Sequence, residues 1–199
     1  MGIRPHSDLV MELQIDTPAI WWFVSRASGI VAWSLLVISV MVGVLLATRV
    51  LKPNDNPGWL YHFHNWLSGL TIVFAITHIT ALMLDSFVTF TILDIAIPFH
   101  SDYVKNPSLG RIPIAFGVLS LYILFAVQLT SLFRQKMSTT AWKAIHYSSY
   151  VLVLLVSAHA GWTGTDITSL IYKMTGIVLI VLSIVAIFVR LIITRVKKS

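Results

Sequence analysis

Four histidines lie inside long apolar stretches of this chain, where an ionisable side chain is costly and usually functional. They form two pairs: His64 and His78 are fourteen residues apart, and His146 and His159 are thirteen apart. On a helix these separations span roughly 20 Å along the axis. Two such helices side by side would present facing imidazoles at two depths, and facing imidazoles can hold an iron porphyrin. The spacing therefore predicts two stacked haems, each with two histidine ligands.

The geometry suits the first pair better than the second. Fourteen residues return an ideal helix to within roughly 40° of its starting face, whereas thirteen leave His146 and His159 about 140° apart. The helix that carries them is therefore expected to be overwound, tilted or kinked, with Ser148 and Ser149 as candidates for local distortion. A lone membrane histidine can instead hydrogen bond a neighbouring helix. Four histidines matched in depth favour ligation.

The other three histidines are weaker candidates. His62 is sixteen residues from His78 and nearly on the opposite helix face, so we expect it at the interface. His100 and His6 are expected in solvent, in a loop and in the N-terminal tail.

The composition is that of an integral membrane protein. The chain has 199 residues, of which 57% are hydrophobic and 11% charged, and its mean hydropathy is +0.84. It has no cysteine, which excludes disulfides, thiolate-ligated iron–sulfur clusters and covalent c-type haem. Any haem must be b-type and non-covalent. The net charge of +6 suits loops beside anionic lipid and does not indicate nucleic acid.

Five apolar runs predict five transmembrane helices in an all-α bundle. The charge-free runs are 27–48, 56–84, 112–133, 144–165 and 174–189. The run 87–99 is too short to span and contains Asp94 and Pro98, so it predicts an interfacial or re-entrant segment. Asp8, Glu12 and Asp16 argue against a signal peptide. We expect an extracytoplasmic tail over 1–20, one transmembrane domain over 21–195 and a cytoplasmic tail over 196–199.

The distribution of charge predicts the orientation. Nine of the fourteen cations share one side with a single acid, Asp55: Arg49, Lys52, Arg134, Lys136, Lys143, Arg190, Arg195, Lys197 and Lys198. The positive-inside rule places this side in the cytoplasm. We expect the protein in the plasma membrane, which is the inner membrane of a bacterium with two membranes. The N-terminus is then outside, and the helices that carry the histidine pairs both run outward. His64 and His146 are expected near the inner face, and His78 and His159 near the outer face.

Arg26 follows Trp21 and Trp22 by about one turn, at the level of the outer headgroups. A buried arginine is stabilised by an anion, and an outer haem propionate or an anionic substrate would serve. Snorkelling to lipid phosphate is the alternative. Three cations could neutralise the inner propionates, although ordinary topology charges would look the same: Lys143, Arg49 and Lys52.

The sequence resembles the ferric reductase-like transmembrane domain family. The resemblance covers roughly 22–166. It rests on HNWLSGLTIVFAITH from His64 to His78, on PFHSDY over 98–103, and on WKAIH ending at His146 with His159 beyond it. The family includes the membrane part of NADPH oxidases and the haem subunit of a bacterial periplasmic methionine sulfoxide reductase. The resemblance implies a cytochrome with two b-type haems, and an arginine in the position of Arg26 beside the outer haem.

Two departures from the family are evident. Asn65 stands where members often have arginine, and we expect neither a sixth helix nor a cytoplasmic flavin and nicotinamide domain. No G-x-G-x-x-G sequence is present. We therefore expect a haem-dependent oxidoreductase that takes electrons from a separate flavoprotein or from quinol.

The expected acceptor is extracytoplasmic, such as a ferric complex or oxygen. Two other functions stay open. The chain could be a haem-bearing membrane anchor that passes electrons to a periplasmic reductase, or a non-redox transporter of metal ions or protons. A transporter predicts acids inside the helices, and only Asp85 and Asp166 occur, at helix ends.

Overall fold

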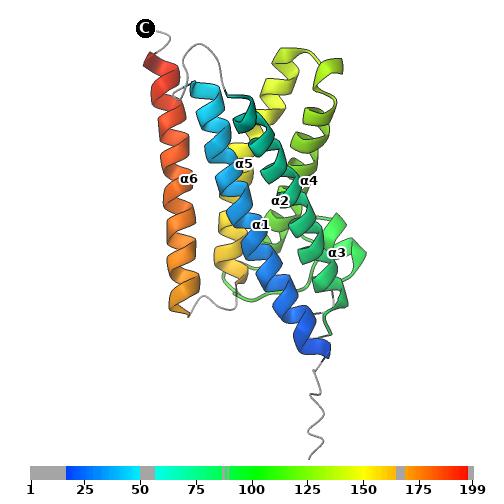
Figure 1. Ribbon diagram of the computed structural model, residues 1–199. Coiled ribbons are helices and arrows are strands. Elements are labelled where there is room, and N and C mark those ends of the chain that lie inside the picture. The colour runs from blue at the N-terminus through cyan, green and yellow to red at the C-terminus, as the bar shows by residue number, and fades with distance from the viewer. Residues whose placement is uncertain (1–16, 50–56, 87, 89, 165–168, 197–199) are drawn as a thin grey trace, which may run out of the picture.

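The structure is a computed structural model that describes residues 17–49, 57–86, 88, 90–164 and 169–196. Across these residues it is all-helical and contains no strand (Figure 1). Its long helices are α1 (Thr17–Thr48), α2 (Gly58–Leu84), α4 (Ile112–Leu132), α5 (Thr139–Thr163) and α6 (Leu170–Val196). A short helix, α3 (Ile92–Ala96), lies between α2 and α4, and a 3₁₀ turn, η1 (Arg134–Lys136), joins α4 to α5.

All five long helices are long and apolar enough to cross a membrane, as the sequence predicts. The first differs in extent, because α1 begins at Thr17, inside the expected tail, and places Arg26 within the helix. The interfacial prediction for 87–99 fits α3, which lies at one end of the bundle beside the end of α2 (Figure 1). Nine positions used in the sequence arguments lie outside the described residues: His6, Asp8, Glu12, Asp16, Lys52, Asp55, Asp166, Lys197 and Lys198.

Two antiparallel helix pairs form the bundle. α1 packs along α2 and α4 packs along α5, whereas α2 and α4 scarcely touch each other. α6 packs mainly against α1 and lies at the edge of the bundle (Figure 1). The pairs are joined on the α6 side by a core that includes Trp33, Val37, Leu152 and Leu179. The Trp33 indole of α1 also donates a hydrogen bond to Ser157 of α5 at 3.1 Å, so the two pairs are tied directly to each other.

Local sequence explains where α4 and α5 begin. Pro113 lies in the first turn of α4, where its missing N–H costs nothing. Ser138 caps α5 by accepting a hydrogen bond from the Ala141 N–H at 3.2 Å. α5 is a continuous α-helix, so the thirteen-residue spacing is accommodated without a break. Ser148 does bond back to the helix, donating to the Ile145 carbonyl at 2.6 Å.

Candidate functional site

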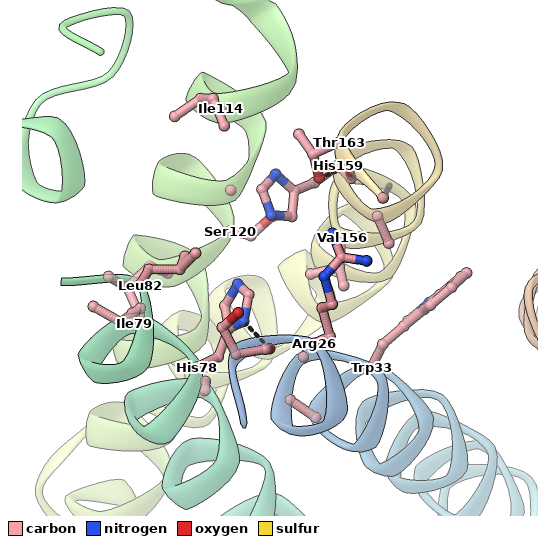
Figure 2. Close-up of a pocket in the computed structure, with 18 of the residues that line it drawn as sticks. Arg26, Trp33, His78, Ile79, Leu82, Ile114, Ser120, Val156, His159 and Thr163 are labelled. Carbon is pink, nitrogen blue, oxygen red and sulfur yellow. Dashed lines mark hydrogen bonds between the residues drawn. The ribbon is translucent and has the colours of Figure 1, made fainter. Parts of the chain in front are cut away.

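The four predicted histidines meet in the two predicted pairs. The rings of His64 and His146 lie 6.1 Å apart between centroids, at an interplanar angle of 61°. Both line a cavity of about 90 Å³ in the half of the bundle near η1. His78 and His159 line a second cavity, of about 280 Å³, in the half near α3. The cavity near η1 is called the inner cavity and the cavity near α3 the outer cavity, after the orientation that the charge distribution predicts. Figure 2 shows these two rings reaching into that cavity from α2 and α5.

Backbone carbonyls of α1 orient both histidines of α2. His78 Nδ1 lies 2.5 Å from the Ser25 carbonyl oxygen, and His64 Nδ1 lies 3.0 Å from that of Ser39. A carbonyl oxygen can only accept, so each Nδ1 carries the hydrogen and donates it. The other ring nitrogen, Nε2, is then the one with a lone pair available for a metal.

α4 orients the histidines of α5 in a similar way. His159 Nδ1 donates to the Pro113 carbonyl at 2.8 Å. His146 Nδ1 has a longer contact, 3.5 Å, with the Ser131 hydroxyl. Three of the four rings are therefore fixed in the Nδ1–H form by carbonyls, and His146 is the least constrained.

Three glycines lie directly against histidine rings. A Cβ on Gly117 would lie 2.7 Å from His159 Cε1, and one on Gly29 would lie 3.0 Å from His78 Nδ1. A Cβ on Gly43 would lie 3.2 Å from His64 Cε1. These positions therefore have room for the imidazole only because they lack a side chain.

The sequence contained a signal for two of these glycines that was missed. Ser25 and Gly29 recur as Ser39 and Gly43, fourteen residues later, which is the spacing of His64 and His78. Because α1 and α2 are antiparallel, the first Ser-x-x-x-Gly element meets His78 and the second meets His64.

Two other glycines, Gly69 and Gly161, are close to the ligand positions in sequence. They face open space and line neither cavity.

Arg26 lines the outer cavity. Its guanidinium carbon is 3.6 Å from the centroid of the Trp22 ring, and both residues line the cavity with His78 and His159. Figure 2 shows the guanidinium between the two histidine-bearing helices. The carboxylate of Asp85, which is 5% exposed, lines the same cavity.

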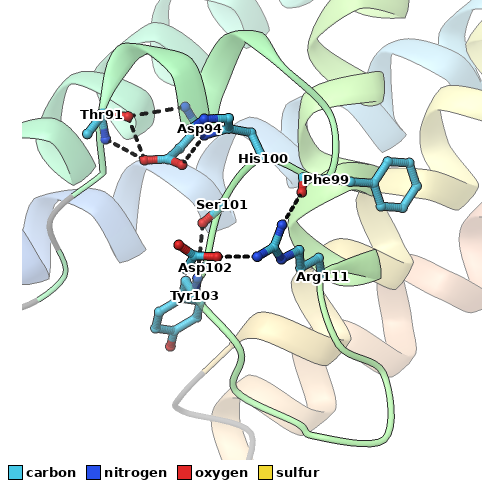
Figure 3. A network of polar contacts seen from close by, with 8 residues as sticks. All are labelled: Thr91, Asp94, Phe99, His100, Ser101, Asp102, Tyr103 and Arg111. Atoms are coloured by element: carbon cyan, nitrogen blue, oxygen red, sulfur yellow. Dashed lines mark hydrogen bonds and ion pairs between the residues drawn. The ribbon is translucent and has the colours of Figure 1, made fainter.

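A polar network beyond α3 covers this end of the bundle (Figure 3). Asp94 accepts hydrogen bonds from His100 Nδ1 at 2.9 Å and from the Thr91 N–H at 2.8 Å. Chiefly because of His100, and then of Thr91, the pKa of Asp94 falls from 3.8 to about 2. Phe99, in a left-handed conformation with φ of 66°, offers its carbonyl to Arg111 at 3.0 Å. His100 is exposed as predicted, but it forms a specific ion pair with Asp94.

The network is also tied to the neighbouring helices. Arg111 bonds Asp102 and Tyr122 bonds the Ala96 carbonyl. Lys105 bonds carbonyls at the end of α5. Residues 90–111 are thereby tied to α4 and to the end of α5.

The inner cavity is bordered by a stack of rings. Trp142 stacks on His146, with 4.9 Å between centroids and 28° between planes. The Arg134 guanidinium lies 4.5 Å from the centroid of the Trp142 ring. Lys143 and Arg49 are exposed and do not line this cavity, so the structure does not bring them to the inner pair. His62 is likewise exposed and lines neither cavity.

The two cavities share a thin wall. Four side chains line both: Leu36, Thr71, Leu124 and Leu152. Thr71 lies midway between His64 and His78, and its hydroxyl bonds the Leu67 carbonyl within α2 at 2.8 Å. The wall is therefore one layer of mostly apolar side chains.

The residues present fit a haem at the His64–His146 pair, and His78 and His159 line one cavity in a similar way. Two metal–imidazole bonds of roughly 2 Å each separate the nitrogens by roughly 4 Å, which ring centroids 6.1 Å apart accommodate. Within the described residues no group of three or more histidine, cysteine or carboxylate side chains gathers. A porphyrin leaves its iron two coordination positions for protein ligands, so a pair of histidines is the number expected. Among described buried side-chain polar atoms, Trp142 Nε1 lacks a hydrogen-bond partner, beside the inner pair.

Residues 28–157 match the family described as ferric reductase like transmembrane component. This chain belongs to that family. The match includes His64, His78 and His146, and His159 lies two residues past its end. Comparison with curated proteins and with solved structures gave no match. Membership suggests an oxidoreductase that transfers electrons across a membrane.

Proposed function

We propose that this chain is a membrane cytochrome that holds two b-type haems and carries electrons from the cytoplasmic side to an extracytoplasmic acceptor. The inner haem would be held by His64 and His146, and the outer haem by His78 and His159. The observation that carries the proposal is the pairing of four histidines, three of them fixed by carbonyls so that Nε2 faces away from its anchor. Family membership supports it.

The haem irons supply the one-electron chemistry when bound. The chain's own residues would set the conditions for it. Ser25, Ser39 and Pro113 orient the imidazoles and raise their basicity as ligands. Arg26 places a positive charge at the outer cavity, where it would stabilise the carboxylate of a haem propionate. The apolar wall around Leu152 keeps the path between the cavities dry.

The proposed arrangement of two haems also bears on the electron donor and the electron acceptor. Two histidines on each iron leave no open coordination position, so reduction of a ferric complex or oxygen would occur at the edge of the outer haem. Electrons would come from a separate flavoprotein or from membrane quinol. Lipid surrounds the five spanning helices.

A second function is favoured by the network of residues 90–111. The chain could anchor a periplasmic reductase and deliver electrons to it without an acceptor site of its own. An ordered, exposed surface held by Arg111 and Asp94 next to the outer cavity suits such a partner. Reduction of a small ferric chelate by the purified protein would distinguish the two, because an anchor needs its partner.

The proposal is tested by haem content. Purified protein should contain two haems b per chain by pyridine haemochrome assay, with a bis-histidine low-spin spectrum. His78→Ala and His159→Ala should each remove the outer haem and leave one. His64→Ala and His146→Ala should each remove the inner haem.

His62→Ala is the matched control. It lies on the same helix, two residues from His64, but is exposed and outside both cavities. It should retain both haems. Protein without haem, or loss of a haem from the His62 variant and not from the His64 variant, would overturn the proposal.

A further inference from the structure

The turn between α4 and α5 carries a basic surface beside the inner histidine pair. Arg134, Lys136 and Lys143 are exposed around it, and Phe133, 53% exposed, adds an apolar contact. No acidic residue occurs from 112 to 164. We call Phe133, Arg134, Lys136 and Lys143 the η1 patch.

A continuous stack leads from the η1 patch to the inner pair. The Arg134 guanidinium covers one ring, Trp142, at 4.5 Å. That ring stacks on His146 at 4.9 Å, and His146 in turn lies 6.1 Å from His64. Trp142 is thus the aromatic side chain between an exposed cation and a proposed ligand of the inner haem.

The excess of positive charge that is usual in cytoplasmic loops explains the cations, but it does not explain the stack of Arg134, Trp142 and His146. Cations at a cytoplasmic turn can bind lipid headgroups. Lipid binding gives no reason for an indole beneath Arg134, in contact with His146 and with its Nε1 buried and unpartnered among the described residues. A redox partner at the η1 patch makes use of both features, because the cations attract it and the indole shortens the path to the inner pair.

We propose that the η1 patch docks an acidic electron-donor protein and that the electron reaches the inner haem across the Trp142 ring. The inference rests on the proposed function. In each turnover the donor loses one electron and the iron held by His64 and His146 gains it. Trp142 bridges the two without being oxidised, and no proton or bond is exchanged.

Binding is tested with a purified, negatively charged flavodoxin as the probe and the haem-loaded protein in zwitterionic nanodiscs. Lys136→Glu should weaken binding by about tenfold at low salt and make it less sensitive to ionic strength. Lys173→Glu is the matched control, because it reverses an exposed charge at the other end of the bundle, and it should leave the affinity unchanged. Equal affinities for the wild type and the Lys136 variant would overturn docking and assign the cations to lipid.

Electron uptake is tested separately by stopped-flow reduction of the inner haem by the reduced flavodoxin. Trp142→Leu should bind the probe normally but slow reduction several-fold, and Trp142→Phe, which keeps a ring, should restore most of the rate. The optical spectrum and midpoint potential should be unchanged, which excludes mere distortion of His146. An unchanged rate in Trp142→Leu, or a slower rate with a shifted potential, would overturn the role of Trp142. Absence of haem would instead refute the proposed function.

Discussion

His78 Nδ1 lies 2.5 Å from the carbonyl oxygen of Ser25, on a different helix. The same relationship recurs fourteen residues away, between His64 and Ser39. Because α1 and α2 run antiparallel, the fourteen-residue repeat of serines in α1 matches the fourteen-residue repeat of histidines in α2. α1 therefore acts as the template that sets the orientation of both α2 rings.

Gly117→Ala tests how closely the proposed ligands are packed. The added Cβ would lie 2.7 Å from His159 Cε1, so the ring must move away from the Pro113 carbonyl that orients it. We expect the variant to lose the outer haem and to keep the inner one. Haem quantification should give one haem per chain, and a reductive titration should show one redox transition fewer than in the wild-type protein.

Gly43→Ala should be milder than Gly117→Ala, because its closest contact, to His64 Cε1, is 3.2 Å. Gly69→Ala is the control: it faces open space in the same helix as His64 and should keep both haems, with a gain in helix stability of up to about 1 kcal/mol. Equal haem content in the Gly117 and Gly69 variants would contradict the packing argument.

Arg26→Gln should change the electrostatics of the outer cavity without removing a ligand. Loss of a positive charge beside His78 and His159 stabilises the oxidised, more positive iron, so the outer midpoint potential should fall. The inner potential should move little. A potentiometric titration that resolves both haems measures the two shifts, with Arg26→Lys as the charge-conserving control. A larger shift of the inner potential would show that Arg26 acts elsewhere.

Asp94 should remain ionised in unusually acidic solution. Its pKa falls from 3.8 to about 2 because His100 and Thr91 donate hydrogen bonds to the carboxylate. A lowered folded-state pKa stabilises the fold above the unfolded value, and this contribution is lost as the pH falls from about 4 towards 2. Carboxyl NMR of labelled protein should show Asp94 charged at about pH 3. Titration near 3.8, or an unchanged titration in His100→Ala, would refute the ion pair's role.

The sequence predicts the pairing of the four histidines because the signal for it is side-chain type and spacing. Four histidines at matched depths indicate the pairs, and five apolar runs indicate the helices. The anchors were not predictable in the same way, because the atoms that fix the rings are backbone carbonyls, which every residue has. Gly117 becomes meaningful only when Pro113 is known to face His159.

The outer network shows a second limit. Asp94 and His100 are six residues apart, with Pro98 between them, and the sequence indicates only a polar loop. Phe99, next to His100, has a left-handed conformation that its residue type rarely adopts, and Arg111 donates a hydrogen bond to its carbonyl. The sequence gives no sign of either feature, because both involve the backbone of Phe99.

The direction of electron flow depends on sidedness, which single cysteines can establish in this cysteine-free chain. Gln135, in η1, and Ser108, in the segment before α4, are both exposed and lie at opposite ends of the bundle. The positive-inside rule places η1 in the cytoplasm. In intact cells an impermeant maleimide should therefore label Ser108→Cys and miss Gln135→Cys, and lysis should expose both. Labelling of Gln135→Cys without lysis would show that the protein has the opposite orientation in the membrane. His78 and His159 would then hold the cytoplasmic haem, and the η1 patch would face an extracytoplasmic partner.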